Sequence, residues 1–195
     1  HRVVSNSTPL DARFTNIALE SRKAGYEPVL FGYTDTAPDP RTLTGADPKG
    51  FSPEGVLPGM QAVVPFKEDF RTWIVNLQQK GYEFRFDTWD MFTPDQNAPD
   101  TENRALTFAP AKYCKEDSPS AFLVDETMKW LSVNNEKPWF IHLSLLAAHP
   151  PFIAPDPYHK MYHPDEVPPL VRAATVEQEV EQHPFPEHVI YNPLD

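Results

Sequence analysis

The chain has 195 residues, which is enough for one domain with a sizeable core. Its 28 acidic and 17 basic residues give a formal net charge of −11, so we expect no nucleic-acid partner, because such a partner requires a basic face. No apolar run approaches the roughly 18 residues of a membrane-spanning helix, and the single cysteine, Cys114, excludes an internal disulfide and a cysteine-rich zinc site.

The first third of the chain predicts a helix, then a strand, then a long loop. Residues 12–26 favour a helix that Thr15 or Asn16 caps and that Gly25 ends. Residues 27–33 form a short apolar run bounded by turn residues, which is typical of a buried strand. A helix leading through glycine into a strand is half of a parallel α/β unit. Residues 34–60, rich in Pro, Asp and Gly, predict a loop long enough to be functional or an insertion.

The rest of the chain repeats the order of helix and strand. Residues 67–82 predict a helix with an apolar stripe at Phe70, Trp73, Ile74 and Leu77. Residues 117–138 predict a helix that Ser118 caps, with Phe122, Leu123, Met128, Trp130 and Leu131 toward the core. Residues 138–151 then predict a second buried strand, which His149 ends, and residues 174–182 predict a short acidic helix.

The two predicted strand ends carry polar side chains where a parallel α/β sheet places its ligands. One end offers the hydroxyls of Tyr33 and Thr34 and the carboxylate of Asp35, and the other offers His149. A histidine there could protonate a leaving group, which typically contributes about 10²–10⁴-fold in rate. The alternatives are a histidine bonded to a backbone carbonyl and turn residues that bond their own backbone.

Three further residue types are interpreted as structural when taken alone. His159 and His163 have the spacing of one helical turn and could hold zinc, but prolines bracket them and no third ligand is evident, so a surface turn is favoured. Cys114 lies between lysines without a histidine nearby in sequence to act as a base. Asn6, in "SNSTPLD", is typical of a turn.

Two segments nevertheless resemble a known family. They are "LFGYTDTAPDPR" and "LSLLAAHPPFIAPDPYHKMYHPDEVPPLVRA", and both are similar to the sulfatase branch of the alkaline phosphatase superfamily, particularly to phosphonate monoester hydrolases and related sulfatases. The segment "NIALESRKAGYEPVLFGY" is similar to the family's helix that leads into an active-site strand. The resemblance implies an alkaline phosphatase-like α/β fold, with a mixed sheet flanked by helices and long proline-rich loops, of which this chain is a partial domain.

The resemblance also implies groups that this sequence lacks. The family's nucleophile is a formylglycine made within a Cys-x-Pro-Ser-Arg motif, and Cys114, which precedes Lys-Glu-Asp, does not match it. The family's metal-binding Asp-Asn/Gln and Asp-His pairs have no counterpart here either. We therefore expect residues 1–195 to be an internal fragment of a sulfatase-type catalytic domain, inactive by itself. The alternatives are an inactive binding or scaffold module of the same fold and an unrelated α/β domain.

The matching positions imply a set of site residues. His149 aligns with the family histidine that contacts the transferred group or the leaving oxygen, so we expect it to be catalytic. Tyr33 and Asn6 align with side chains that reach the substrate, and Thr34 is a neighbouring candidate. Asp35 stands where the phosphonate hydrolase branch has threonine; an added carboxylate would favour a monoanionic diester or a sulfate over a dianionic ester.

The function implied is metal-dependent hydrolysis of sulfate esters, phosphodiesters or phosphonate monoesters. The metal would be a divalent cation (Ca, Mn or Zn) with its ligands outside this fragment, and the substrate a small anionic ester. We expect the full-length protein to be a homo-oligomer with neither a nucleic-acid nor a membrane partner. We expect a cytoplasmic location, with the periplasm as the alternative.

Overall fold

The protein is described by a computed structural model. It covers residues 3, 8–42, 54–67, 69–83, 88–99, 101, 108–147, 149–169 and 172–182. The chain divides into two compact units, His1–Met161 and Tyr162–Asp195.

The first unit contains a three-stranded parallel sheet. Its strands are β1 (Pro28–Gly32), β2 (Gln61–Pro65) and β3 (Phe140–Leu143), in the order β2-β1-β3. All five residues of β1 are buried, whereas β2 and β3 are only partly buried. The continuous apolar run of β1 therefore fits its central position, since a central parallel strand is covered on both faces.

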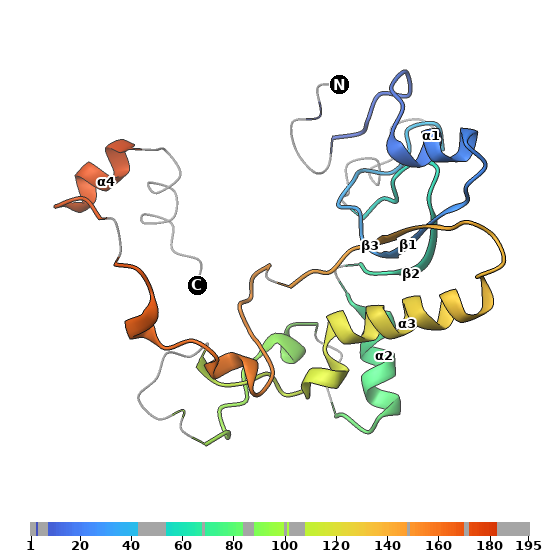
Figure 1. Cartoon of the computed structure of the whole chain (residues 1–195). Helices are drawn as coiled ribbons and strands as arrows, with labels where there is room; N and C mark the ends of the chain where they lie inside the picture. Colours follow the sequence, from blue (N-terminus) through green and yellow to red (C-terminus); the bar gives the residue numbers. More distant parts are fainter. Residues whose placement is uncertain are drawn as a thin grey trace. The chain divides into compact units, whose positions relative to one another are not determined.

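Helices cover both faces of this sheet. Figure 1 shows α1 (Ile17–Lys23) on one face and α2 (Arg71–Gln79) with α3 (Pro119–Val133) on the other. The sequence signals at the helix starts are confirmed: the Asn16 Oδ1 accepts from the backbone N–H groups of residues 18 and 19 at 2.9 and 3.0 Å. The Ser118 Oγ accepts from the residue 121 N–H at 3.2 Å. The predicted α/β class is thus confirmed, and the described strands are parallel.

The main core lies between the sheet and helices α2 and α3. Trp73, Leu77 and Leu123 are fully buried there together with Phe31 of β1. Trp73 also donates its indole N–H to the Asp117 carbonyl at 2.7 Å, so its one polar group is satisfied. The predicted stripe on residues 67–82 is therefore confirmed as the buried face of α2.

The structure corrects three details of the predicted elements. Strand β2 was not expected, because "QAVVP" is a five-residue run with proline at its end. Helix α2 begins only at Arg71, since Phe70 adopts a left-handed backbone conformation with φ of 44° while its ring enters the core. Met128, expected to be in the core, is 59% exposed on α3.

The expected end of the second strand is also wrong. Strand β3 stops at Leu143, six positions before His149, and residues 144–147 are in neither a helix nor a strand. His149 is thus a loop residue and not a strand terminator. Among the described residues β3 has β1 as its one neighbouring strand, which fits its partial burial.

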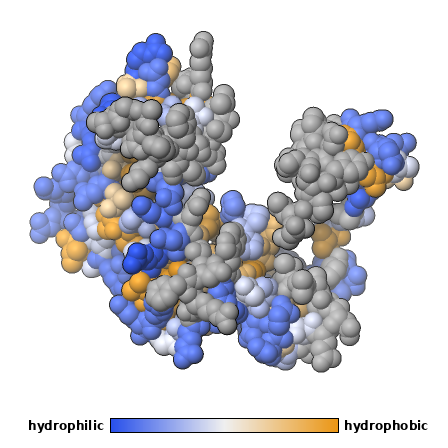
Figure 2. All heavy atoms as spheres, turned by 180° about the vertical axis from the view of Figure 1, so that it is seen from behind, coloured by the Kyte–Doolittle hydropathy of each residue, from blue (hydrophilic) through white to orange (hydrophobic). Residues whose placement is uncertain are grey.

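The second unit contains α4 (Val176–Gln182), which confirms the short acidic helix. Arg172, which precedes α4, forms an ion pair with Glu179 in the helix at an Nε–Oε1 distance of 2.5 Å. Within the described residues, no helix combines the length and apolar character needed to cross a bilayer. The view in Figure 2 shows a largely hydrophilic surface with separate hydrophobic patches.

Candidate functional site

The carboxyl ends of β1 and β3 lie side by side. The strands are parallel neighbours, with Phe31 opposite Leu143, and the Phe31 carbonyl accepts from the Ser144 N–H at 2.8 Å. Gly32 makes this approach possible: its φ is 104°, and a Cβ there would lie 2.3 Å from the Ser144 carbonyl oxygen. The sheet therefore brings the segments after the two strands to one edge, where α/β sheets bind their ligands.

The hydroxyl of Thr34 is committed to the loop that follows β1. It donates to the Gly55 carbonyl at 3.1 Å, accepts from the Leu57 N–H at 3.1 Å and lies 2.9 Å from the Thr36 hydroxyl. A hydroxyl offers one donor and two acceptor positions, so with Thr36 as a donor these contacts use all of them. A substrate contact by Thr34, as predicted, would require one of these bonds to break.

Gly55 allows the outgoing and returning halves of this loop to touch. A Cβ at Gly55 would lie 2.3 Å from the Ala37 carbonyl carbon, and the Gly55 N–H donates to the Thr36 carbonyl at 2.8 Å. The long loop predicted over residues 34–60 is therefore closed on itself where it is described.

Tyr33 and Asp35 lie on either side of Thr34 in different surroundings. Tyr33 is partly buried and its side chain packs against the main core. Asp35 is exposed and has a φ of 50°, a left-handed conformation that aspartate tolerates better than most residues. It is Asp35, of these two, that lines a pocket.

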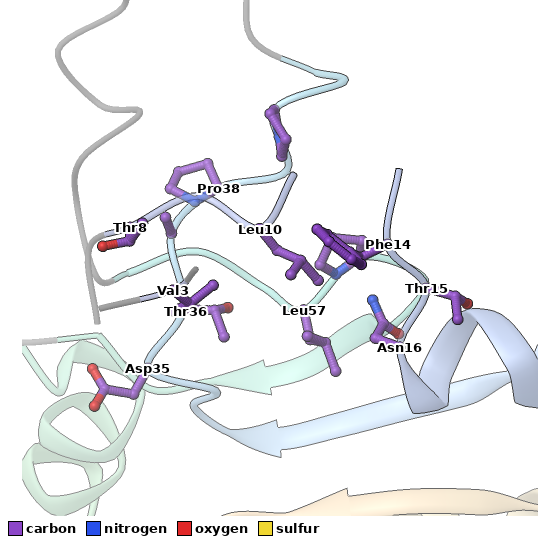
Figure 3. Close-up of a pocket in the computed structure, with 13 residues that line it drawn as sticks. Val3, Thr8, Leu10, Phe14, Thr15, Asn16, Asp35, Thr36, Pro38 and Leu57 are labelled. Atoms are coloured by element: carbon purple, nitrogen blue, oxygen red, sulfur yellow. The ribbon is translucent and has the colours of Figure 1, made fainter. Parts of the chain in front are cut away.

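This pocket has a volume of about 570 Å³ and lies where β1 ends and α1 begins. Figure 3 shows Leu10, Phe14 and Leu57 around it, with Asp35 and Asn16 at different parts of its rim. The lining is mostly apolar, because prolines and aliphatic side chains from the segments after β1 and before β2 complete it. Sequence reasoning missed the pocket, since its walls come from three separate segments, within residues 3–16, 35–40 and 57–58.

The two polar atoms of the Asn16 side chain differ in their hydrogen bonding at this pocket. Its Oδ1 accepts the two N–H groups that begin α1, whereas its Nδ2 is buried and has no hydrogen-bond partner among the described residues. A buried donor left without an acceptor costs about 1–3 kcal/mol. The Asn16 side chain therefore stabilises the start of α1 through Oδ1, whereas its buried Nδ2 lowers the stability of the fold.

His149 is exposed, and its ring is held by its own loop. The His149 N–H donates to the Leu146 carbonyl at 2.8 Å, and Nδ1 lies 2.8 Å from the Pro150 carbonyl oxygen. A carbonyl oxygen only accepts, so Nδ1 carries the proton in this contact. Nε2 is then the ring nitrogen available to a ligand, as an acceptor when the ring is neutral and as a donor when it is protonated.

The predicted site residues are thus brought together only in part. The backbone places Tyr33–Asp35 and the segment leading to His149 at the same sheet edge. Of these side chains only Asp35 lines the pocket described above. Asn6 lies outside the described residues. A shared cleft for Tyr33 and His149, and a catalytic role for His149, therefore stay predictions.

The described residues do not provide the metal site that the resemblance implies. No group of three or more His, Cys, Asp and Glu side chains that could hold a metal occurs among them. His159 instead packs its ring edge-on against Phe108 at 5.8 Å, with 7% of its side chain exposed, and its Nδ1 lies 3.6 Å from an Asp156 carboxylate oxygen.

A polar cluster around Asp117 joins α2 to the start of α3 and was also not expected. The Asp117 carboxylate pairs with Lys80 and accepts from the Tyr82 hydroxyl at 2.8 Å and the Cys114 thiol at 3.1 Å. Partial burial alone would raise the pKa of Asp117, but these hydrogen bonds outweigh it and lower the pKa. Burial is the main cause that raises the pKa of Tyr82. The cluster gives Cys114 a structural contact, as interpreted from the sequence.

Similarity to known proteins extends over nearly the whole chain. The sulfatase family matches residues 1–169. A multifunctional alkaline phosphatase superfamily protein, PehA of Trinickia caryophylli, is 34% identical over 192 residues, which are 97% of this chain and 36% of that protein.

Solved structures agree with this match. The phosphonate monoester hydrolase of Agrobacterium radiobacter gives a TM-score of 0.83 at 41% identity, covering 96% of this chain and 36% of that one. The phosphonate monoester hydrolase of Silicibacter pomeroyi gives a TM-score of 0.85 at 37% identity, and the match covers 100% of this chain and 38% of that one. The chain thus spans little more than a third of the length of these relatives. With its fold and its matched residues, the chain belongs to the sulfatase family of the alkaline phosphatase superfamily.

Proposed function

We propose that this chain is part of a hydrolase that cleaves small anionic esters, namely sulfate esters, phosphodiesters or phosphonate monoesters. The family match and the similarity to two phosphonate monoester hydrolases support this class of reaction. The observation that carries the proposal is that β1 and β3 end side by side, with the Ser144 N–H bonded to the Phe31 carbonyl. Tyr33 directly follows the first strand, and His149, whose Nδ1 lies 2.8 Å from the Pro150 carbonyl oxygen, lies further along the chain after the second. The formylglycine nucleophile and the divalent cation belong to the proposal through the family alone.

His149 would act on the leaving oxygen of the ester. As the bond from sulfur or phosphorus to that oxygen breaks, the oxygen gains negative charge and requires a proton. Because Nδ1 is held on the Pro150 carbonyl, only the doubly protonated ring can offer this proton from Nε2. The active form of His149 is therefore the imidazolium, and the neutral ring would serve only as an acceptor.

Tyr33 and Asn6 would hold the non-bridging oxygens of the ester. Fixed hydroxyl and amide donors stabilise charge that develops on such oxygens in the transition state. Asp35, exposed nearby, adds one negative charge to the same strand end. We therefore expect monoanionic esters to be preferred over dianionic phosphate monoesters, since the carboxylate repels the second charge more strongly.

The proposal is tested in the complete polypeptide that contains this segment. His149→Ala should lower kcat by about 10²–10⁴-fold, while the folded structure is kept because the ring is exposed. His163→Ala is the matched control, since that ring is 60% exposed in the second unit and should change kcat little. An unchanged kcat in His149→Ala would remove this residue from the mechanism.

Turnover by the unaltered polypeptide decides the wider proposal. We expect hydrolysis of a phosphonate monoester, a phosphodiester and a sulfate monoester to exceed that of a phosphate monoester. No turnover of any of these esters would favour the binding or scaffold module instead. A homo-oligomer and a cytoplasmic location are further parts of the proposal, which light scattering and cell fractionation would check.

A further inference from the structure

The pocket at the end of β1 has the size and lining of a site for a small organic group. Its volume of about 570 Å³ lies within the range of small-molecule sites, which are mostly apolar with a few polar groups. Leu10, Phe14 and Leu57 form its walls, as Figure 3 shows. Such walls do not suit an ionised sulfate or phosphate, because burying a charge there without a partner is costly. They suit an aryl or branched alkyl group.

The pocket adjoins the predicted position of the anionic group. Asp35 lines it and follows Tyr33 by two residues, and Thr36, which also lines it, contacts the Thr34 hydroxyl at 2.9 Å. An ester whose anionic group lies at the strand end would therefore have its organic part directed into the apolar space beside it.

The wall that contains Leu57 is held by hydrogen bonds, as a specificity pocket requires. The Leu57 N–H is bonded to the Thr34 hydroxyl at 3.1 Å, and Gly59, two residues on, accepts from the Arg22 side chain of α1 at 2.5 Å. The segment before β2 is thus bonded to both the end of β1 and helix α1. A rigid apolar wall discriminates between ligands that differ by a few carbon atoms.

We propose that this pocket binds the apolar organic group of the ester and so selects aryl and branched alkyl esters over methyl esters. The inference rests on the proposed function and adds the class of organic group to it. Pocket contacts to one methylene group change kcat/KM by about 10-fold or more, so loss of an aromatic wall should be readily measured.

The first experiment compares two esters in one variant of the complete polypeptide. Phe14→Ala should lower kcat/KM for the phenyl ester of a phosphonate by about tenfold and lower it less for the methyl ester of the same phosphonate. Comparing variant with wild type for each ester cancels the difference in their intrinsic reactivity. Phe14 is 42% exposed, so its replacement should leave the fold intact.

A matched control and a second variant make the comparison sharper. Ile17→Ala, at a side chain that is 63% exposed and does not line the pocket, should change neither ester. Leu57→Trp, which fills the pocket, should lower kcat/KM for the phenyl ester more than for the methyl ester. Equal losses for the two esters, or no loss in either variant, would overturn the inference while leaving the hydrolase proposal standing.

A direct binding measurement separates this inference from the proposed function. If the polypeptide turns over no ester, the hydrolase proposal fails, and benzyl alcohol then serves as a neutral aryl probe by NMR. Shifts of the Thr15 and Asn16 amides that disappear in Phe14→Ala would support an aryl pocket without catalysis. Absence of such shifts in the wild type would overturn it.

Discussion

The two strand ends that meet at the sheet edge are built in opposite ways. After β1, the loop is held by bonds to residues 21 and 23 positions away, from Thr34 to Gly55 and Leu57. After β3, the described bonds of His149 reach only Leu146 and Pro150. The first end thus forms a fixed wall through tertiary contacts, whereas the second presents an exposed ring through local ones.

Because of this difference, we expect substitutions at the two strand ends to affect different properties of the protein. The Thr34 hydroxyl at the first end is used for structure, so its removal should affect stability and pocket shape together. The ring at the second end contributes little to the fold, so changes there should affect activity alone. Stability measurements on the chain can test this division without any substrate.

The largest effect is expected where the two ends touch. Gly32→Ala adds a Cβ 2.3 Å from the Ser144 carbonyl oxygen at a φ of 104°. Backbone strain and overpacking together should lower the free energy of unfolding by about 2–5 kcal/mol. Gly25→Ala is the matched control, with a φ of 89° and no atom within 4 Å of the added carbon, so it retains only the backbone strain. If urea unfolding shows the same loss of stability in Gly32→Ala and Gly25→Ala, β1 and β3 do not approach as closely as described.

The next effect concerns the loop after β1. Thr34→Val removes a hydroxyl with bonds to Gly55 and Leu57 and should lower the free energy of unfolding by about 1–3 kcal/mol. Thr34→Ser keeps the hydroxyl and should retain most of that stability. If Thr34→Val unfolds at the same urea concentration as wild type, the Thr34 bonds do not stabilise the loop after β1, and the contrast with the segment after β3 fails.

Asp117 provides a third set of long-range bonds and a dependence on pH. Its pKa is lowered in the folded chain, so the charged carboxylate stabilises the fold at neutral pH, and this stability is lost as pH falls from about 4 through the lowered value. Asp117→Asn should therefore lower stability at pH 7 and flatten the loss of stability on acidification. An unchanged acid profile in thermal unfolding would contradict the role of the cluster.

A smaller effect is expected at the pocket rim. Asn16→Ala removes the cap of α1 and should lower the free energy of unfolding by about 1 kcal/mol. Asn16→Ser keeps a capping oxygen and removes the Nδ2 that has no partner among the described residues, so it should be at least as stable as wild type. If urea unfolding shows Asn16→Ser to be as unstable as Asn16→Ala, the amide nitrogen does have a partner.

The smallest effect is expected at His149. His149→Ala removes a single described side-chain bond, to the adjacent Pro150 carbonyl, from an exposed ring. The free energy of unfolding should therefore change by no more than about 0.5 kcal/mol. A larger loss of unfolding free energy would show that the His149 ring stabilises the fold, and the two strand ends would then not differ in this respect.

Local signals in the sequence predicted most of the elements. Asn16 and Ser118 mark helix starts by their own side chains, and the run 28–32 marks a central strand by being apolar throughout. Strand β2 was missed because its five residues carry little pattern of their own and, within the described part of the chain, pair with β1 alone. The early end of β3 was missed because an apolar run continues past the last residue that pairs.

The α/β class, the helix caps, the buried central strand and the resemblance that the family match confirms could all be read from the amino-acid order. These follow from side chains acting on their near neighbours or from motifs readable along the chain. Folding in three dimensions was needed to reveal the contact that requires Gly32, the use of the Thr34 hydroxyl, and the pocket between Leu10, Phe14 and Leu57. Each of these depends on the distance between segments remote in sequence, which strand pairing sets and no local pattern records.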